Sequence, residues 1–163
     1  MELRMYGLVN YQLTGIQKGI QFLHGVVEYG QKYKNTELYN KWANEYKTVI
    51  LLDGGTTSDK LIEVDDVFIK HGSLNRHLDT IKEMDIPVAE FREPDLGDQL
   101  TAVVLIVSED VFNIPTNGEY MKKNGSYTLG SKSRAEVALE CRQKEYGEEN
   151  VELKDFLSQF RLA

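Results

Sequence analysis

Thr14-Gly-Ile-Gln-Lys-Gly-Ile-Gln-Phe-Leu-His-Gly25 directly follows an apolar run over residues 3–13, and this order predicts a strand that leads into a helix. Thr14 and Gln17 have the spacing of a capping box, in which a hydroxyl and an amide satisfy two backbone N–H groups left unpaired at a helix start. The helix is therefore expected to begin at about Thr14 and to continue to about Tyr33.

Two stripes of side chains run along this predicted helix. Apolar residues recur at i, i+4, i+7 and i+11, and polar residues fall on the adjacent face. The apolar stripe consists of Ile16, Ile20, Leu23 and Val27, and the polar stripe consists of Gln17, Gln21, His24 and Glu28. We expect the apolar stripe to face the core. The polar stripe is then either a chemical site or a solvated rim.

The composition is that of a globular protein, since 41% of the 163 residues are hydrophobic and 28% are charged. This length predicts one domain with a sizeable core. The sequence pattern predicts neither a signal peptide nor a membrane-spanning run. Cys141 is the only cysteine, which excludes an intrachain disulfide and favours a reducing, cytoplasmic setting, the host cytoplasm if the protein is viral. The net charge of −7 opposes non-specific attraction to nucleic acid, so any RNA contact needs a local basic surface.

Further strands are expected where short apolar runs occur. Residues 48–52 form a continuous apolar run that predicts a strand buried on both faces, and 86–91 and 101–107 predict two more. The run Asp53-Gly-Gly-Thr-Thr57 is expected to form a loop at the end of the first of these strands, the edge where open α/β sheets usually bind ligands. This loop is either a simple turn or a phosphate cradle.

Helices are expected between these strands. A short helix is predicted at 36–46, and Ser73 is the predicted N-cap of another, whereas 60–71 is ambiguous between helix and strand. The alternation predicts a three-layer α/β/α domain over residues 1–110, with a central mixed sheet of about four strands plus a C-terminal helical extension.

The last third, residues 111–163, contains predicted turns and helices. Turn-forming dipeptides within 117–130 predict a hairpin or a mobile flap. Ser133 and Glu136 form a second capping box that opens a helix, and Asn150 is expected to cap the final one. The apolar stripe of the final helix consists of Leu153, Phe156, Leu157 and Phe160. We expect this stripe to pack on the first domain, with a second subunit as the alternative.

The order of these elements resembles the type II peptidyl-tRNA hydrolases of archaea and eukaryotes, and looks closest to the small versions found in bacteriophage genomes. The family pattern on the first helix is Gly-Lys-x-x-Ala-Gln-x-x-His-Ala, and Gln21-Phe-Leu-His24-Gly25 is similar to its second half. In this register the catalytic lysine of the family falls on Gln17, and the adjacent Lys18 is the available amine.

The second family signature is Asp-Ala-Gly-Arg-Thr followed by Gly-Ser-x-Thr-Val. The equivalent segment here is Phe91-Arg-Glu-Pro-Asp-Leu-Gly-Asp-Gln-Leu-Thr101, in which Glu93 or Asp95 takes the place of the aspartate. Thr101 matches the later threonine, whereas the arginine and the first threonine have no counterpart. The resemblance covers residues 3–108.

The resemblance implies hydrolysis of the ester bond between a peptide, or an N-blocked amino acid, and tRNA, with no cofactor and no metal. Its catalytic candidates are Lys18, Glu93, Asp95 and His24, and its substrate-binding candidates are Gln17, Gln21 and Thr101. A lysine ammonium can stabilise an oxyanion while a carboxylate orients or deprotonates water. The alternative for each residue is a structural or solvated role. Asp53, Asp59, Asp65 and Asp66 are either a cation site or, as we expect, a solvated acidic face.

A candidate tRNA surface lies around the first two predicted helices. Its lysines are Lys32, Lys34, Lys41 and Lys47, and they alternate with Tyr29, Tyr33, Tyr39, Trp42 and Tyr46. The aromatic residues either stack on bases or belong to the core. The resemblance also implies a homodimer. The alternative function is an inactive fold relative that binds tRNA, a nucleotide or a host protein, with residues 117–163 as the protein-binding segment.

Overall fold

The computed structural model of the chain describes residues 1–56, 62–64, 67–69 and 72–163. These residues form two compact units. The α/β unit contains residues 2–107 and 160–163, and the helical unit contains Met1 and residues 108–159. Residues 160–163 therefore belong to the same unit as residues 2–107.

The α/β unit is built on a four-stranded sheet. Its strands are β1 (Leu3–Asn10), β2 (Val49–Gly55), β5 (Val88–Glu93) and β6 (Gln99–Ser108). They lie in the order β2-β1-β6-β5. The sheet is mixed, because β1 and β2 are parallel whereas β5 and β6 are antiparallel. The predicted α/β fold with a mixed sheet of about four strands is confirmed.

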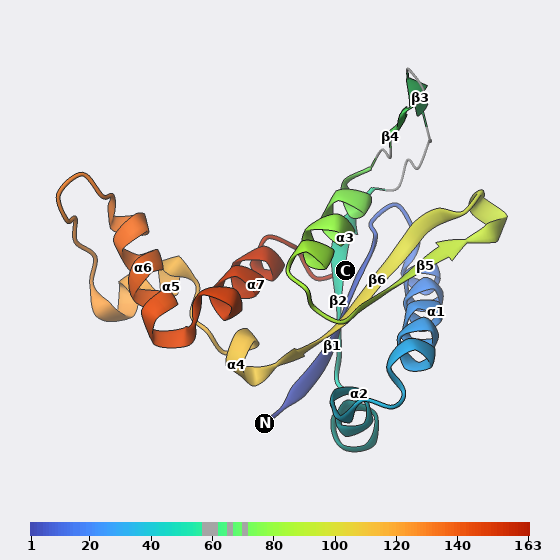
Figure 1. Cartoon of the computed structure of the whole chain (residues 1–163), viewed down its shortest axis with the longest axis horizontal. Coiled ribbons are helices and arrows are strands. Elements are labelled where there is room, and N and C mark those ends of the chain that lie inside the picture. Colours follow the sequence, from blue (N-terminus) through green and yellow to red (C-terminus); the bar gives the residue numbers. More distant parts are fainter. Residues whose placement is uncertain (57–61, 65–66, 70–71) are drawn as a thin grey trace. The chain divides into compact units, whose positions relative to one another are not determined.

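Helices cover both faces of this sheet, which gives the three predicted layers (Figure 1). One face packs on α1 (Gly15–Tyr33) and on α2 (Glu37–Lys41), which continues into a π-helical turn. The other face packs on α3 (Ser73–Glu83) through Leu74, Leu78 and Ile81. Gly25 permits the close approach of α1, since a Cβ atom there would lie 2.6 Å from the side chain of Val104.

The rotation of α1 about its axis differs from the prediction. The stripe expected in the core is exposed, with Ile16 80% and Leu23 60% accessible. The stripe that faces the sheet has the same spacing and consists of Phe22, Val26, Tyr29 and Tyr33. Because aromatic rings bury more apolar area than aliphatic side chains, packing favours this second stripe. The capping box of Thr14 and Gln17, by contrast, is confirmed.

Two further predictions for the α/β unit were wrong. The strand expected to be buried on both faces is the edge strand β2, where Val49 is 42% exposed and the strand continues through Asp53 to Gly55. The N-cap of α3 is Gly72, and the hydroxyl of Ser73 instead accepts a 2.8 Å hydrogen bond from the backbone N–H of Thr56.

The segment that the sequence left ambiguous contains a pair of short strands. These are β3 (Ile62–Val64) and β4 (Val67–Ile69), which pair in antiparallel fashion. The other residues of 60–71, and with them the aspartates 59, 65 and 66 of the suggested acidic cluster, lie outside the described residues.

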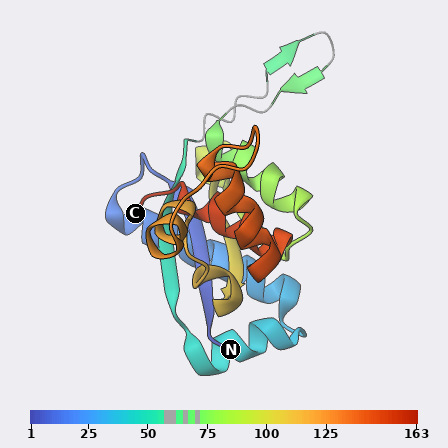
Figure 2. The same ribbon diagram turned by 90° about the vertical axis from the view of Figure 1, so that its left-hand side faces the viewer.

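The helical unit consists of α4 (Glu109–Phe112), α5 (Asn117–Asn124), α6 (Arg134–Tyr146) and α7 (Glu148–Ser158), and α6 and α7 pack side by side (Figure 2). The expected hairpin or flap is in part the helix α5, because the Thr116 hydroxyl caps it by accepting from the Glu119 N–H. The capping box position of Ser133 starts α6 as predicted.

The final helix begins earlier than predicted. Its N-cap is Gly147, and Asn150 lies inside α7, where its side-chain amide donates to the carbonyl oxygen of Tyr146. The predicted stripe is buried at Leu153, Phe156 and Leu157, and α7 contacts α4 and α6. Phe160 lies beyond the end of α7 and belongs to the α/β unit, where its ring contacts His77. The expected packing of the helix itself on the α/β domain stays a prediction.

Candidate functional site

Two sets of polar side chains lie on the sheet-facing side of the first two turns of α1. Lys18 and Gln21 come from the helix, three residues apart and therefore on neighbouring positions of one face. The strand ends supply carboxylates from Asp53 of β2 and Glu93 of β5, and β6 supplies Thr101. All five residues belong to the α/β unit.

Gln21 links Thr101 to Glu93 by two hydrogen bonds. The hydroxyl of Thr101 donates to Oε1 of Gln21 at 2.6 Å, and Nε2 of Gln21 donates to Oε2 of Glu93 at 2.8 Å. Thr101 and Gln21 are both buried. Because Thr101 engages the carbonyl oxygen of the amide, the NH₂ group is turned towards the carboxylate. The structure therefore brings together three residues of the predicted site.

The hydrogen bond from Gln21 also favours the charged form of Glu93. It lowers the pKa of the carboxyl group below its ordinary value of 4.5, against a smaller opposing effect of desolvation. The backbone N–H of Asp95, which donates to Oε1 at 3.4 Å, and the nearby His24 lower the pKa further. Glu93 is therefore ionised at neutral pH. Of the two carboxylates that the sequence left open, Glu93 contacts the helix, and Asp95 lies exposed in the following 3₁₀ turn.

The amine of Lys18 is held by a residue that sequence reasoning had placed in a loop. Nζ of Lys18 lies 2.7 Å from Oδ1 of Asp53, and the two side chains are only 15% and 31% exposed. Asp53 was not among the predicted site residues. Its position at the carboxyl end of β2 was the available signal, since the ends of parallel strands β1 and β2 meet there.

The other two candidates on α1 lie at the margin of this group. His24 is exposed and stacks on the ring of Phe91, with a centroid distance of 4.5 Å and an interplanar angle of 20°. Gln17 is exposed, and its side-chain carbonyl accepts a 3.1 Å hydrogen bond from the backbone N–H of Thr14. Gln17 therefore completes the helix cap at the entrance to α1.

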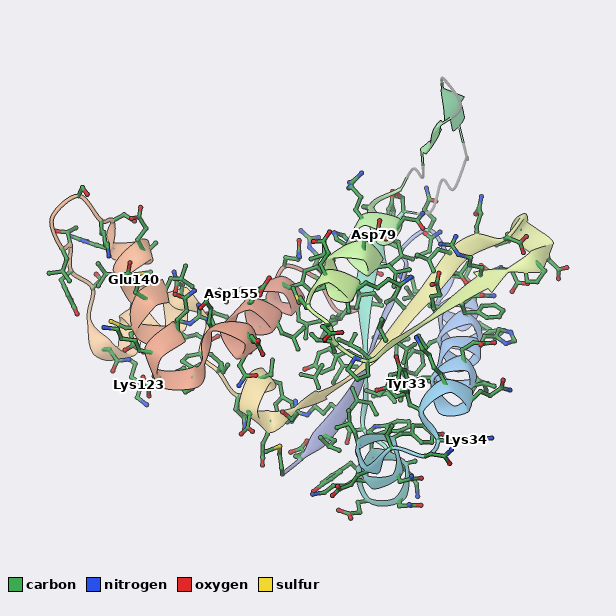
Figure 3. All side chains as sticks on the ribbon, in the orientation of Figure 1. Tyr33, Lys34, Asp79, Lys123, Glu140 and Asp155 are labelled. Carbon is green, nitrogen blue, oxygen red and sulfur yellow. The ribbon has the colours of Figure 1, made fainter. Side chains whose placement is uncertain are left out.

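The lysines and aromatic residues of the candidate tRNA surface have separate roles. Tyr29 and Trp42 are buried, and Tyr33, Tyr39 and Tyr46 pack against the same core cluster, which decides the open question in favour of core. The amine of Lys32 donates to the carbonyl oxygen of Val88 at 3.1 Å. Lys34 points outward at the end of α1 (Figure 3), and Lys41 is partly exposed in the last turn of α2.

Neither metal binding nor membrane spanning is indicated by the part of the chain that the structure describes. Within it, no group of three or more His, Cys, Asp or Glu side chains is arranged to hold a metal ion. Among the described helices, none is both long and apolar enough to cross a membrane.

Comparisons with known proteins give no family for this chain. No protein-family model matches the sequence, and no curated protein matches it. The function proposed below therefore depends on the chemistry of the residues around Lys18 and around Glu93. Lys18 and Gln21 lie one turn apart on α1, whereas their carboxylate partners, Asp53 and Glu93, come from the two edge strands β2 and β5. An ammonium and a carboxylate are groups that hydrolysis of an activated carbonyl can use.

Proposed function

We propose that the protein hydrolyses the ester bond between a peptide, or an N-blocked amino acid, and tRNA. The observation that supports this proposal best is the hydrogen-bonded chain from Thr101 through Gln21 to Glu93, on the helix face that also carries Lys18. The resemblance of this segment to type II peptidyl-tRNA hydrolases supplies the substrate class.

In the proposed reaction, water attacks the acyl carbonyl carbon, the ester C–O bond breaks, and the 3′-terminal ribose oxygen of tRNA leaves with a proton. Glu93 orients the attacking water through the lone pairs that Gln21 and the Asp95 N–H leave free. The lowered pKa makes Glu93 a weak base, so orientation is its main contribution. The ammonium of Lys18, positioned by Asp53, stabilises the negative charge that develops on the carbonyl oxygen.

The tRNA in this proposal is bound through its phosphates. Lys34 and Lys41 offer amines near the end of α1 and in α2, whereas the amine of Lys32 is already bonded to Val88. A net charge of −7 opposes association with a polyanion. Each lysine–phosphate contact releases counterions, so we expect binding to weaken as salt rises, with a small slope because Lys34 and Lys41 supply only two such contacts.

The activity is tested by incubating the purified protein with N-acetylated aminoacyl-tRNA and measuring release of the blocked amino acid. Lys18→Ala is expected to lower kcat by roughly 100-fold or more, because the oxyanion loses its ammonium. Glu93→Gln should also lower kcat. Lys144→Ala is the matched control, since Lys144 is an exposed lysine of α6 in the helical unit.

Thermal unfolding followed by circular dichroism shows whether each variant is folded. Turnover that is unchanged in Lys18→Ala, or absent from the folded wild-type protein, contradicts the proposal.

A second candidate function is a binding module that has kept the fold without the chemistry. It is favoured by the ion pair of Lys18 with Asp53, because the carboxylate offsets the positive charge that would stabilise the oxyanion. In that case deacylated tRNA, or a protein bound through residues 117–163, associates without turnover. Fluorescence anisotropy with labelled deacylated tRNA, combined with the turnover assay on the same wild-type protein, separates the two candidates, because binding without turnover favours the second.

A homodimer is part of the proposal, and the outward face of α1 is suited to it. Ile16, Ile20, Leu23 and Val27 are each about half exposed or more. Two copies of α1 that cross in antiparallel fashion about a two-fold axis place Ile20 of one copy opposite Leu23 of the other, and Ile16 opposite Val27, so the stripe is complementary to itself. Sedimentation velocity of Leu23→Asp should show a monomer where the wild type shows a dimer.

A further inference from the structure

The C-terminal residues 160–163 pair with the outer edge of β2. Leu162 lies opposite Leu52 in an antiparallel bridge. The backbone N–H of Asp53 donates to the carbonyl oxygen of Arg161 at 2.8 Å, and the N–H of Ala163 donates to that of Leu51 at 2.9 Å. The edge strand is therefore held on one side by β1 and on the other by the end of the chain, where the C label lies beside β2 (Figure 1).

Phe160 packs this tail against α3. Its ring meets the imidazole of His77 edge-on, with a centroid distance of 4.7 Å. Nδ1 of the same imidazole lies 2.7 Å from the carbonyl oxygen of Gly54, the residue after Asp53. The side chains of Arg161, Leu162 and Ala163 are exposed. The tail thus contacts β2 through its backbone and α3 through one aromatic ring, and His77 links that ring to the residue after Asp53.

The inner side of β2 holds Asp53 less regularly than the rest of the strand. The register between β1 and β2 shifts at this point, since Val9 pairs with Asp53 but Asn10 pairs with Gly55. Asp53 is also followed by two glycines, of which Gly55 has a φ of 118°. Glycine restricts the backbone least of all residues. Hydrogen bonds from the Tyr11 N–H to the Gly55 carbonyl oxygen and from the Thr56 N–H to the Ser73 hydroxyl hold the residues after Asp53. The hydrogen bond from Asp53 to Arg161 adds a constraint at Asp53 itself.

We propose that the C-terminal tail, residues 160–163, is a positioning element that holds Asp53 in place to bind and orient the Lys18 amine. The tail bonds the backbone of Asp53, and the carboxylate of the same residue bonds Nζ of Lys18. Releasing the tail loosens Asp53 and with it the ammonium. The kinetic consequence rests on the proposed hydrolase function, whereas the positioning of Lys18 can be measured without it.

The first test compares the full chain with a variant that ends at Gln159. Amide hydrogen exchange, followed by NMR, is expected to show at least about tenfold faster exchange at Asp53, while amides of β6 keep their protection. Lys18 should react faster with an amine-acylating reagent, as measured by mass spectrometry of the peptide that contains it. A synthetic peptide of residues 158–163 should restore both values.

Two point variants guard against a truncation that fails to fold. Ala163→Pro removes one N–H donor to β2 and leaves every side chain contact of Phe160 in place. It is expected to shift Asp53 exchange and Lys18 labelling in the same direction by a smaller factor. Leu162→Ala is the matched control, because the Leu162 side chain is 75% exposed and its backbone is unchanged.

If the protein hydrolyses N-acetylated aminoacyl-tRNA, truncation should lower kcat with little change in KM, because the tail acts on the ammonium rather than on substrate binding. Unchanged Asp53 exchange and Lys18 labelling in the folded truncated protein overturn the inference, whether or not the wild type is active. A wild type without turnover, combined with altered labelling of the truncated protein, overturns the proposed function and retains the positioning role.

Discussion

The side-chain amide of Gln21 donates to the carboxylate of Glu93 at 2.8 Å, across 72 residues of sequence. Thr101 orients the amide for this bond, because its hydroxyl donates a hydrogen bond to the carbonyl oxygen of the same amide. A polar residue in the middle of a helix thus joins two strands of the sheet. The same bond is the largest cause of the lowered pKa of Glu93.

Gln21→Leu should raise the pKa of Glu93 towards its ordinary value of 4.5, because the largest stabilising contact of the charged form is lost. A carboxyl ¹³C NMR titration measures this shift. The acid limb of the kcat/KM profile should move to higher pH with it. Gln31→Leu is the control, since Gln31 is an exposed glutamine of the same helix.

The stability effect of the same bond has a defined pH dependence. A lowered pKa in the folded state stabilises the fold above the unfolded pKa, and this stabilisation is lost as the pH falls through the folded pKa. The wild type should therefore exceed Gln21→Leu in free energy of unfolding by more at neutral pH than at strongly acidic pH. A difference that is constant over this range contradicts the assignment of the bond.

Two neighbouring residues of α1 test the rotation of the helix. Phe22→Ala should lower the free energy of unfolding by about 3–5 kcal/mol, because its ring is only 8% exposed in the core. Leu23→Ala should change it by no more than about 0.5 kcal/mol when measured on the monomer, since Leu23 faces away from the sheet. Urea unfolding of both variants at low protein concentration measures the difference. Equal losses contradict the observed rotation.

Arg142 and Asp155 test the helical unit. The guanidinium of Arg142 is fully buried and donates to both carboxylate oxygens of Asp155, at 3.0 and 2.7 Å. Asp155→Ala removes the carboxylate partner of this charge and should destabilise the helical unit by about 1.5–3 kcal/mol, because the Asp155 side chain is 42% exposed. The double variant Arg142→Met/Asp155→Leu should recover part of the lost stability, because it also removes the buried charge of Arg142.

Hydrogen exchange of amides in α6 and α7 measures the stability of the helical unit separately from that of the α/β unit. A double variant that is less stable than Asp155→Ala shows that the side chain of Arg142 is needed beyond its charge. Its further hydrogen bond to the carbonyl oxygen of Pro115, at 2.8 Å, is then the contact to examine.

The hydroxyl of Tyr29 is a buried polar group that, unlike the guanidinium of Arg142, has no hydrogen-bond partner among the residues that the structure describes. Burial raises the pKa of this hydroxyl strongly, so it stays neutral. Tyr29→Phe should leave the free energy of unfolding unchanged or raise it by about 1 kcal/mol, because an unsatisfied polar group is removed from the core. Tyr33→Phe is the contrasting variant, since the Tyr33 hydroxyl bonds the backbone of Val88 and its loss should destabilise the protein.

Interactions within one helical turn were predictable from the sequence. The capping box at Thr14 and the N-cap at Ser133, whose hydroxyl accepts from the Glu136 N–H, place the starts of α1 and α6 correctly, because the partners lie within four residues. Residues that meet across the sheet were predictable only in part. The resemblance to a known family grouped Gln21 with Glu93 and Thr101, and no spacing along the chain would have done so.

Tertiary packing determines which of two equally spaced apolar stripes of α1 faces the sheet. The helix α1 carries two apolar stripes with the same spacing, and the sequence alone favours neither, whereas the area buried by Phe22 and Tyr29 against the sheet does. The partner of Lys18 likewise depends on tertiary structure. Asp53 lies 35 residues away along the chain and reaches the amine only because β2 runs parallel beside β1 and ends next to the start of α1. Capping energies depend on neighbours in sequence, whereas burial and ion pairing depend on which surfaces the whole chain brings together.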